Sequence, residues 1–402
     1  MNIRDQLDRY FVASKFDATP PREIAVTTSR AECEHIVTVF PSHRRHGIFE
    51  LDSFGGVFRN APQMLVRDNA GETTDFGRIA FIDTETTGLS GGSGVCAFLV
   101  GLGYNSAKGF VVEQFLMNDF PTEPDMLGRV CERLGTFDTI ASYNGRSFDI
   151  PILDSRLLLN GLRKNLSSLP HLDLLHPARR VWKHRLADCS LKSVEEHVLG
   201  YTRDNDIESW LIPETFFVYL RSGDRDLLEP ILHHNRLDIL SLACIGHVVL
   251  AALDSPHEAA FTHGADWYGL GTLFALHYRM EEAARCFERA MVVGAPEHVR
   301  RQCMKSLSLT HKKTGEWENA VELWNESSAA GNGADALFAL EELAKFYEHR
   351  RRDLVSAREV CRRAIAMLEV KEVIGGADLT RHFGNFEYRL KRIEKKIRSR
   401  KA

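Results

Sequence analysis

The chain has 402 residues and a formal net charge of −4, so it is long enough for two or three domains and carries no overall positive charge that would indicate a polyanionic partner. Its eight cysteines include no C-x-x-C pair, which argues against a zinc ribbon or a disulfide scaffold and suits a reducing compartment. We find no apolar stretch near the roughly 18–20 residues of a membrane span and no signal peptide, and therefore expect a soluble, cytoplasmic protein.

Residues 1–75 are expected to form an N-terminal extension. The stretch HIVTVFPSHRRHGIFELDSF alternates apolar and polar residues, which predicts a short β-hairpin. Its histidines and arginines, from His43 to His46, are candidates for a phosphate contact, although a solvated turn is the favoured interpretation.

Residues 76–252 show a mixed α/β pattern. Three apolar runs, RIAFID, CAFLVGLGYN and GFVVEQFLM, are separated by short connections and predict three antiparallel strands. A helix in TEPDMLGRVCERL, a strand in TIASYN and further helices follow, the longest of them in NRLDILSLACIGHVVLAAL. This order predicts a mixed sheet flanked by helices.

Residues 258–402 are all-helical and repetitive in pattern. Three similar helices begin at Ala283, Ala320 and Ala357, and larger apolar residues recur four positions after each of them, at Phe287, Trp324 and Cys361. A period near this length, with small residues where helices cross, is typical of stacked helical hairpins. The first copy resembles a tetratricopeptide repeat, and the chain ends in a basic tail, RLKRIEKKIRSRKA.

Four acidic residues follow elements of the predicted sheet domain. Asp83 and Glu85 are two apart on one strand and so point to the same face, Asp149 begins a helix, and Asp238 lies in the first turns of the longest helix. Carboxylates gathered at one sheet edge repel one another unless divalent cations neutralise them, and Mg²⁺ or Mn²⁺ suits an all-oxygen site. Two such ions roughly 3.5–4 Å apart would activate a water for phosphodiester cleavage.

The motifs that carry these acids, DTETTGL, NGRSFD and HHNRLD, resemble the three motifs of the DEDD family of 3′→5′ exonucleases in the ribonuclease H-like superfamily. The connecting text, including GGSGVCAFLVGLGY and HNRLDILSL, is similar to a narrower group, the YprB-like ribonuclease H-like proteins. The resemblance is strong over residues 75–252 and moderate over the repeats. It implies a ribonuclease H-like exonuclease fold and metal-dependent trimming of single-stranded DNA or RNA from the 3′ end.

The same resemblance assigns roles to single residues. Asp83, Glu85 and Asp238 would ligate one metal, and Asp83 would bridge to a second metal held by Asp149. The family's general base is a histidine five residues before the last aspartate or a tyrosine four before it. His233 has the histidine spacing and is favoured as the base, while His234 occupies the tyrosine position.

Substrate contacts are expected beside the acids. Thr84, Thr86 and Leu89 would lie near the terminal nucleotide, whereas Asn144 is foremost a helix-capping candidate and Phe148 is expected in the core. A cationic stretch with an interleaved aromatic suits a single strand: Arg179, Arg180, Trp182 and Lys183. A solvated helix face with Trp182 turned inward is an equal alternative, and Asp173 is a candidate for supporting the acidic cluster.

Two other functions remain open at the level of sequence. The chain would act as a scaffold through its helical repeats if the nuclease site were vestigial, and the repeats are in any case the expected place for a protein partner. A structure-selective endonuclease is the third possibility, because two-metal chemistry on this fold does not require a free end.

Overall fold

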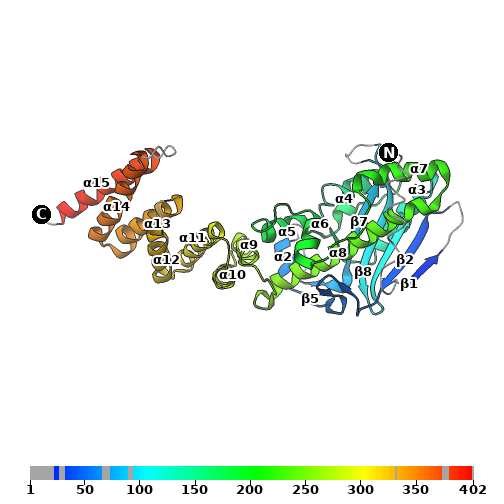
Figure 1. Cartoon of the computed structure of the whole chain (residues 1–402), viewed down its shortest axis with the longest axis horizontal. Coiled ribbons are helices and arrows are strands. Elements are labelled where there is room, and N and C mark those ends of the chain that lie inside the picture. The colour runs from blue at the N-terminus through cyan, green and yellow to red at the C-terminus, as the bar shows by residue number, and fades with distance from the viewer. Residues whose placement is uncertain are drawn as a thin grey trace. The chain divides into compact units, whose positions relative to one another are not determined.

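The computed structural model describes residues 22–26, 32–65, 73–88, 94–330, 333–373 and 380–400. The chain divides into two compact units, Met1–Ala260, here called the sheet unit, and Phe261–Ala402, the helical unit. Figure 1 shows the strands gathered in the first unit and only helices in the second.

A mixed sheet of seven strands forms the centre of the described part of the sheet unit, in the order β1-β2-β9-β8-β7-β10-β11. β7 (Ile79–Thr86), β8 (Ala97–Ser106) and β9 (Gly109–Leu116) pair antiparallel, as their apolar runs predicted. β10 (Thr139–Ser142) and β11 (His171–Asp173) extend the sheet in parallel beside β7. The predicted mixed sheet flanked by helices is confirmed.

The N-terminal residues join this sheet instead of forming a hairpin module of their own. β1 (Arg22–Val26) pairs with β2 (Glu34–Phe40), and β2 pairs antiparallel with β9. Only the second half of the expected hairpin pairs with itself, as β3 (Arg45–His46) and β4 (Phe49–Glu50). Alternation of apolar and polar residues predicts that a strand exists but does not say which strand it will pair with.

Apart from the long helix α8 described below, the remaining helices and strands of the sheet unit are short. They are β5 (Val57–Phe58), α2 (Asn60–Leu65), β6 (Thr74–Asp75), α3 (Glu123–Leu134), α4 (Asp149–Leu159), α5 (Leu175–Trp182), α6 (Leu191–Val194) and α7 (Ile212–Ser222). α6 continues as a π-helical turn, Glu195–Leu199, which ends at the left-handed Gly200.

The longest helix, α8 (Glu229–Asp254), packs across β7, β8 and β9 (Figure 1). It approaches closely because β8 has a glycine at the crossing point. A Cβ at Gly101 would stand 2.2 Å from Cδ1 of Ile239 and 2.3 Å from Oδ1 of Asn235. The glycine therefore lets α8, which carries Asp238, lie directly against the strands that carry the other acids.

Length and composition alone would allow one segment, Arg225–Asp254, to cross a membrane. The expectation that no stretch is long and apolar enough was therefore wrong for this segment. However, 72% of its most apolar window is buried inside the protein, as in a core helix.

The helical unit is built from consecutive helices that pack against one another in chain order. The alanines Ala283, Ala320 and Ala357 and their partners Phe287, Trp324 and Cys361 are all buried. The predicted period thus marks the second helix of each hairpin. The helices are α9 (Gly264–Leu276), α10 (Met280–Val293), α11 (Glu297–Thr314), α12 (Trp317–Ala329), α13 (Ala334–Lys345), α14 (Leu354–Val373) and α15 (Thr380–Ser399).

A buried carboxylate joins α15 to the rest of the helical unit. Glu348 lies on the π-helical turn after α13, Phe346–Arg351, and its side chain is 0% exposed. It accepts hydrogen bonds from Arg389 at 3.0 Å, Arg392 at 2.6 Å and Lys396 at 2.8 Å. Burial by itself would raise the pKa of Glu348, but the bonds from Arg392 and Lys396 lower it to about 2.

We expect Glu348→Gln to lower the free energy of unfolding of the chain at neutral pH by about 1–3 kcal/mol, because three cations lose their shared anion. A depressed carboxyl pKa stabilises the fold above the ordinary glutamate value. The difference from wild type should therefore be complete above about pH 4.3 and narrow as the pH falls towards 2. Urea unfolding at several pH values measures it.

The matched control is Glu394→Gln, also an ion pair of α15, whose partner Arg362 on α14 is half exposed. It should change stability by less than about 1 kcal/mol. Equal stabilities of wild type and Glu348→Gln at neutral pH would contradict the assignment.

Candidate functional site

The four predicted acids come from three elements and interact at the carboxyl end of β7. Asp83 and Glu85 lie on β7, Asp149 begins α4, and Asp238 is the tenth residue of α8, in its third turn. Asp238 and Asp149 lie close enough to Asp83 and Glu85 for their charges to help raise the pKa values of those two residues. The structure therefore brings the four acids together.

Burial raises the pKa of Asp83 well above its ordinary value, and repulsion from Asp238 and Glu85 adds to the rise. Burial also raises the pKa of Glu85 to about 8, against the attraction of His234 and with the repulsion of Asp238. The pKa of Asp149 rises with burial to about 6, although a hydrogen bond from Thr84 opposes the rise. The cluster is short of positive charge.

A tight turn positions Asp149 beside β7. The Thr84 hydroxyl donates to Oδ1 of Asp149 at 2.5 Å. A Cβ at Gly145 would stand 2.7 Å from Oδ2 of Asp149, so the glycine of the NGRSFD motif is required for this close approach. Asp173 supports the same turn, because its carboxylate accepts the backbone N–H groups of Asn144 at 2.9 Å and Arg146 at 3.3 Å.

Two buried amides orient Asp83. The side-chain amide of Asn235 donates to Oδ2 of Asp83 at 2.8 Å. Gln114 on β9 in turn donates to Oδ1 of Asn235 and to the Leu232 carbonyl, both at 2.9 Å. The sequence analysis missed both residues. A polar residue on the buried face of α8, within HHNRLD itself, was the available signal.

A buried arginine, also missed, reaches the cluster from the loop before α7. The Arg203 side chain is 2% exposed, and its Nη2 lies 2.5 Å from Oδ1 of Asp238. The same guanidinium donates to Glu195 at 2.8 Å and to Asp206 at 3.1 Å. One guanidinium thus partly neutralises three carboxylates, one of which belongs to the site.

His234 supplies a second cation. Its Nδ1 is 2.7 Å from Asp206, and its Nε2 is 3.5 Å from Asp238 and 4.0 Å from Glu85. Burial alone would lower the pKa of His234, but the charge of Asp238 and the hydrogen bond to Asp206 raise it to about 10. In the cluster without metal, these carboxylates therefore favour the protonated imidazole.

This arrangement places His234, and not the predicted His233, among the acids. Both histidines lie on the continuous α8, where His233 is exposed and His234 is buried among the acids. The regular helix turns His234, the neighbouring residue, towards the cluster.

A pocket of about 200 Å³ adjoins Glu85 and Asp149. Thr84 and Thr86 line it as expected, and the Thr86 hydroxyl donates to the Gly88 carbonyl at 2.8 Å. Phe148 is half exposed and lines the pocket, so its assignment to the core was wrong. Leu89 lies outside the described residues. The other lining residues, which the sequence analysis did not identify, are Gly88, Ile152, Ser209, Ile212 and Pro213.

On α5 the aromatic residue of the cationic stretch is turned inward, as the second interpretation predicted. Trp182 is 0% exposed and cannot stack on a base, which corrects its proposed role. Arg179, Arg180 and Lys183 are exposed on the outer face of the helix. Asn144 does not cap α4, because that helix begins at Asp149, and it adopts a left-handed conformation with φ of 69°.

The donor set matches a divalent cation in its chemistry, since carboxylate oxygens are the ligands that Mg²⁺ and Mn²⁺ prefer. In the part of the chain that the structure describes, however, no three acidic, histidine or cysteine side chains stand ready as a metal-binding group. Arg203 holds an oxygen of Asp238 that a metal would use. The residues therefore fit the ion once the ion pair between Arg203 and Asp238 opens.

Comparison with known proteins places these residues in a family. A sequence profile of the RNase_H superfamily matches residues 80–249. Over 335 residues the chain is 30% identical to "Uncharacterized protein YprB" of Bacillus subtilis (strain 168), covering 81% of this chain and 79% of that protein. Among solved structures, a family B DNA polymerase from the hyperthermophilic archaeon Pyrobaculum calidifontis is 16% identical. That match covers 50% of this chain and 29% of the polymerase, and its TM-score of 0.33 supports no further conclusion.

We expect Arg203→Met to lower the free energy of unfolding by about 3–5 kcal/mol, because three buried carboxylates lose their common cation. Chemical denaturation in a chelating buffer measures the change. Arg225→Met is the control: this arginine also contacts two carboxylates, Glu34 and Glu229, but is 44% exposed. The control should lose less than about 1 kcal/mol. Equal losses in the two variants would contradict the role given to Arg203.

Proposed function

Because the chain belongs to the YprB-like family of the ribonuclease H superfamily, we propose that it is a metal-dependent nuclease acting on single-stranded nucleic acid. We infer that residues 76–252 hold the active site and remove nucleotides from the 3′ end. The observation that carries this proposal is the meeting of Asp83, Glu85, Asp149 and Asp238 at the end of β7. The direction of cleavage, from the 3′ end, we take from the resemblance of the three motifs to those of the DEDD exonucleases.

Nucleases of this superfamily generally use divalent metals, and we propose two Mg²⁺ or Mn²⁺ ions here. Asp83, Glu85 and Asp238 would hold one ion, and Asp83 and Asp149 the other. When bound, such ions lower the pKa of a water and stabilise the leaving oxygen of a phosphodiester. The Gln114–Asn235 pair would keep Asp83 oriented towards them.

We propose that His234, which is held by Asp206 and lies beside Glu85 and Asp238, is the histidine that acts at this site. The charge of Asp238 and the hydrogen bond to Asp206 keep its pKa raised when no metal is bound. Metal ions held by Glu85 and Asp238 would neutralise those charges and lower the pKa, so that His234 would then be able to take a proton from the attacking water.

The pocket beside Glu85 supports a single-stranded substrate. It combines the hydroxyls of Thr84 and Thr86 with apolar walls from Phe148 and Ile212. A pocket of about 200 Å³ is too small for a duplex and would receive at most part of one unstacked nucleotide. The exposed cations of α5 would contact the phosphates of the following nucleotides.

A second candidate function is a scaffold with an inactive nuclease site. The ion pair between Arg203 and Asp238 favours it, because a guanidinium occupies a carboxylate that the metal needs. In either case we propose a cytoplasmic protein whose helical unit, a set of tetratricopeptide-like repeats, recruits a protein partner.

We expect Mn²⁺ to raise the melting temperature of the wild-type chain and to have much less effect on Asp83→Asn. A metal that binds only the folded state stabilises it, by about 2.7 kcal/mol at a hundredfold excess over its Kd. The control Asp138→Asn removes an exposed carboxylate that pairs with Arg78 outside the site. It should retain the full shift with Mn²⁺. A wild-type chain that Mn²⁺ does not stabilise would support the scaffold.

We also expect the chain to degrade labelled single strands from the 3′ end in Mg²⁺ or Mn²⁺, with Asp83→Asn at least about 10²–10³-fold slower because a metal ligand is lost. A panel of single-stranded, duplex and circular DNA and RNA, resolved on gels, measures this. Cleavage of circles would show an endonuclease, and cleavage that survives Asp83→Asn would contradict the assigned site.

A further inference from the structure

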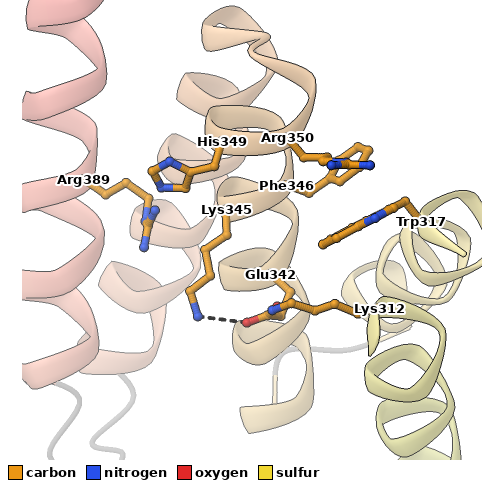
Figure 2. Close-up of a pocket in the computed structure, with 8 residues that line it drawn as sticks. All are labelled: Lys312, Trp317, Glu342, Lys345, Phe346, His349, Arg350 and Arg389. Carbon is orange, nitrogen blue, oxygen red and sulfur yellow. Dashed lines mark hydrogen bonds and ion pairs between the residues drawn. The ribbon is translucent and has the colours of Figure 1, made fainter. Parts of the chain in front are cut away.

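The helical unit contains a second pocket, of about 410 Å³. Figure 2 shows side chains from three directions around it, with Trp317 at the start of α12 facing α13 and Arg389 facing it from α15. Its lining residues are Lys312, Trp317, Glu342, Lys345, Phe346, His349, Arg350 and Arg389. Neither the nuclease site nor the repeat pattern accounts for this combination.

One wall of the pocket is aromatic and carries a cation. The rings of Trp317 and Phe346 lie 5.8 Å apart between centroids at an interplanar angle of 25°, close to parallel. The guanidinium of Arg350 lies 5.4 Å from the centroid of the Trp317 ring (Figure 2). Flat rings and a guanidinium plane together suit a planar, polarisable ligand.

The other walls are positively charged. Lys312 and Lys345 share Glu342, with Nζ–Oε distances of 2.5 and 2.8 Å, and Glu342 is the single acid among the lining residues. Arg389 shares Glu348 with two further cations of α15. Cations therefore outnumber carboxylates around the pocket, and an anionic ligand would restore the balance.

The backbone is unusual at this point. Phe346, His349 and Arg350 all lie on the π-helical turn Phe346–Arg351, which ends at Arg352 in a left-handed conformation with φ of 57°. A π-turn carries one residue more than an α-turn and so rotates the following side chains around the helix. Such turns are rare and are frequent at functional sites.

We propose that this pocket binds one nucleotide of a single strand, with its base against Trp317 and Arg350 and the strand's phosphates at Lys312, Lys345 and Arg389. Stacking on aromatic rings combined with cations along the backbone is the usual mode of sequence-tolerant single-strand binding. Cations alone would equally suit an acidic peptide, but the stacked rings under Arg350 favour a base. This inference rests on the proposed function in one respect: the ligand is taken to be the single strand that the nuclease degrades.

The test is binding of a fluorescent oligothymidylate to the full chain in a chelating buffer, followed by anisotropy over a range of salt concentrations. We expect Trp317→Leu to weaken binding by about tenfold, as loss of one stacked base predicts, and Trp317→Phe to keep most of the affinity. Arg350→Ala should weaken binding several-fold. The control Arg301→Ala removes an exposed arginine of α11 outside the pocket and should stay within about twofold of wild type.

Trp317 also packs against the core of α12 and α13, so Arg350→Ala, which changes an exposed side chain, tests the pocket if Trp317→Leu does not fold. Unchanged affinity in Arg350→Ala would overturn the proposal. It would also be overturned if an abasic strand or a polyglutamate peptide bound as tightly as the oligothymidylate.

Cleavage separates this proposal from the nuclease. A chain that cleaves while the pocket variants bind like wild type keeps the nuclease and refutes the pocket. If binding depends on Arg350 but the chain does not cleave, the pocket proposal stands and the nuclease proposal is refuted.

Discussion

Repulsion among Asp83, Glu85, Asp149 and Asp238 is the constraint on which the sheet unit depends. Buried carboxylates that repel one another are costly to ionise. Two buried cations, Arg203 and His234, offset part of this cost. These cations are themselves tied to Glu195 and Asp206 and so compensate the site only in part. A partly compensated acidic cluster is a low-stability arrangement that a fold retains for function, and the function that we propose here is the binding of divalent cations.

The ionic network explains why the N-terminal residues belong to the sheet unit. His46, on β3, is 1% exposed, with its Nε2 2.7 Å from Ser241 and 3.4 Å from Glu195. Ser241 also donates to Glu195, which binds Arg203. A chain of buried polar contacts therefore runs from β3 to Asp238. Because buried charges are costly when a partner is removed, residues distant in sequence are coupled to the geometry of the acids.

The parts that sequence predicted well are those set by local pattern. Alternation and helical spacing identified β7, β8 and β9, and the repeat of Ala283, Ala320 and Ala357 identified buried positions in the helical unit. Motifs located the four acids because their spacing follows from the ends of strands and helices.

What sequence could not show depends on contacts between distant segments. The pairing of β2 with β9, the inward turn of Trp182 and the reach of Arg203 into the site all arise from tertiary packing. The choice between His233 and His234 depended on whether α8 begins before or after them.

The most direct measurement is the anomalous difference density of a crystal soaked in Mn²⁺. The account predicts a peak in contact with Asp83 and Asp238, with the Arg203 guanidinium withdrawn from Asp238 towards Glu195 and Asp206. Absence of density among the four acids, with the Arg203–Asp238 ion pair intact at saturating Mn²⁺, would contradict the claim that these carboxylates exist to hold metal.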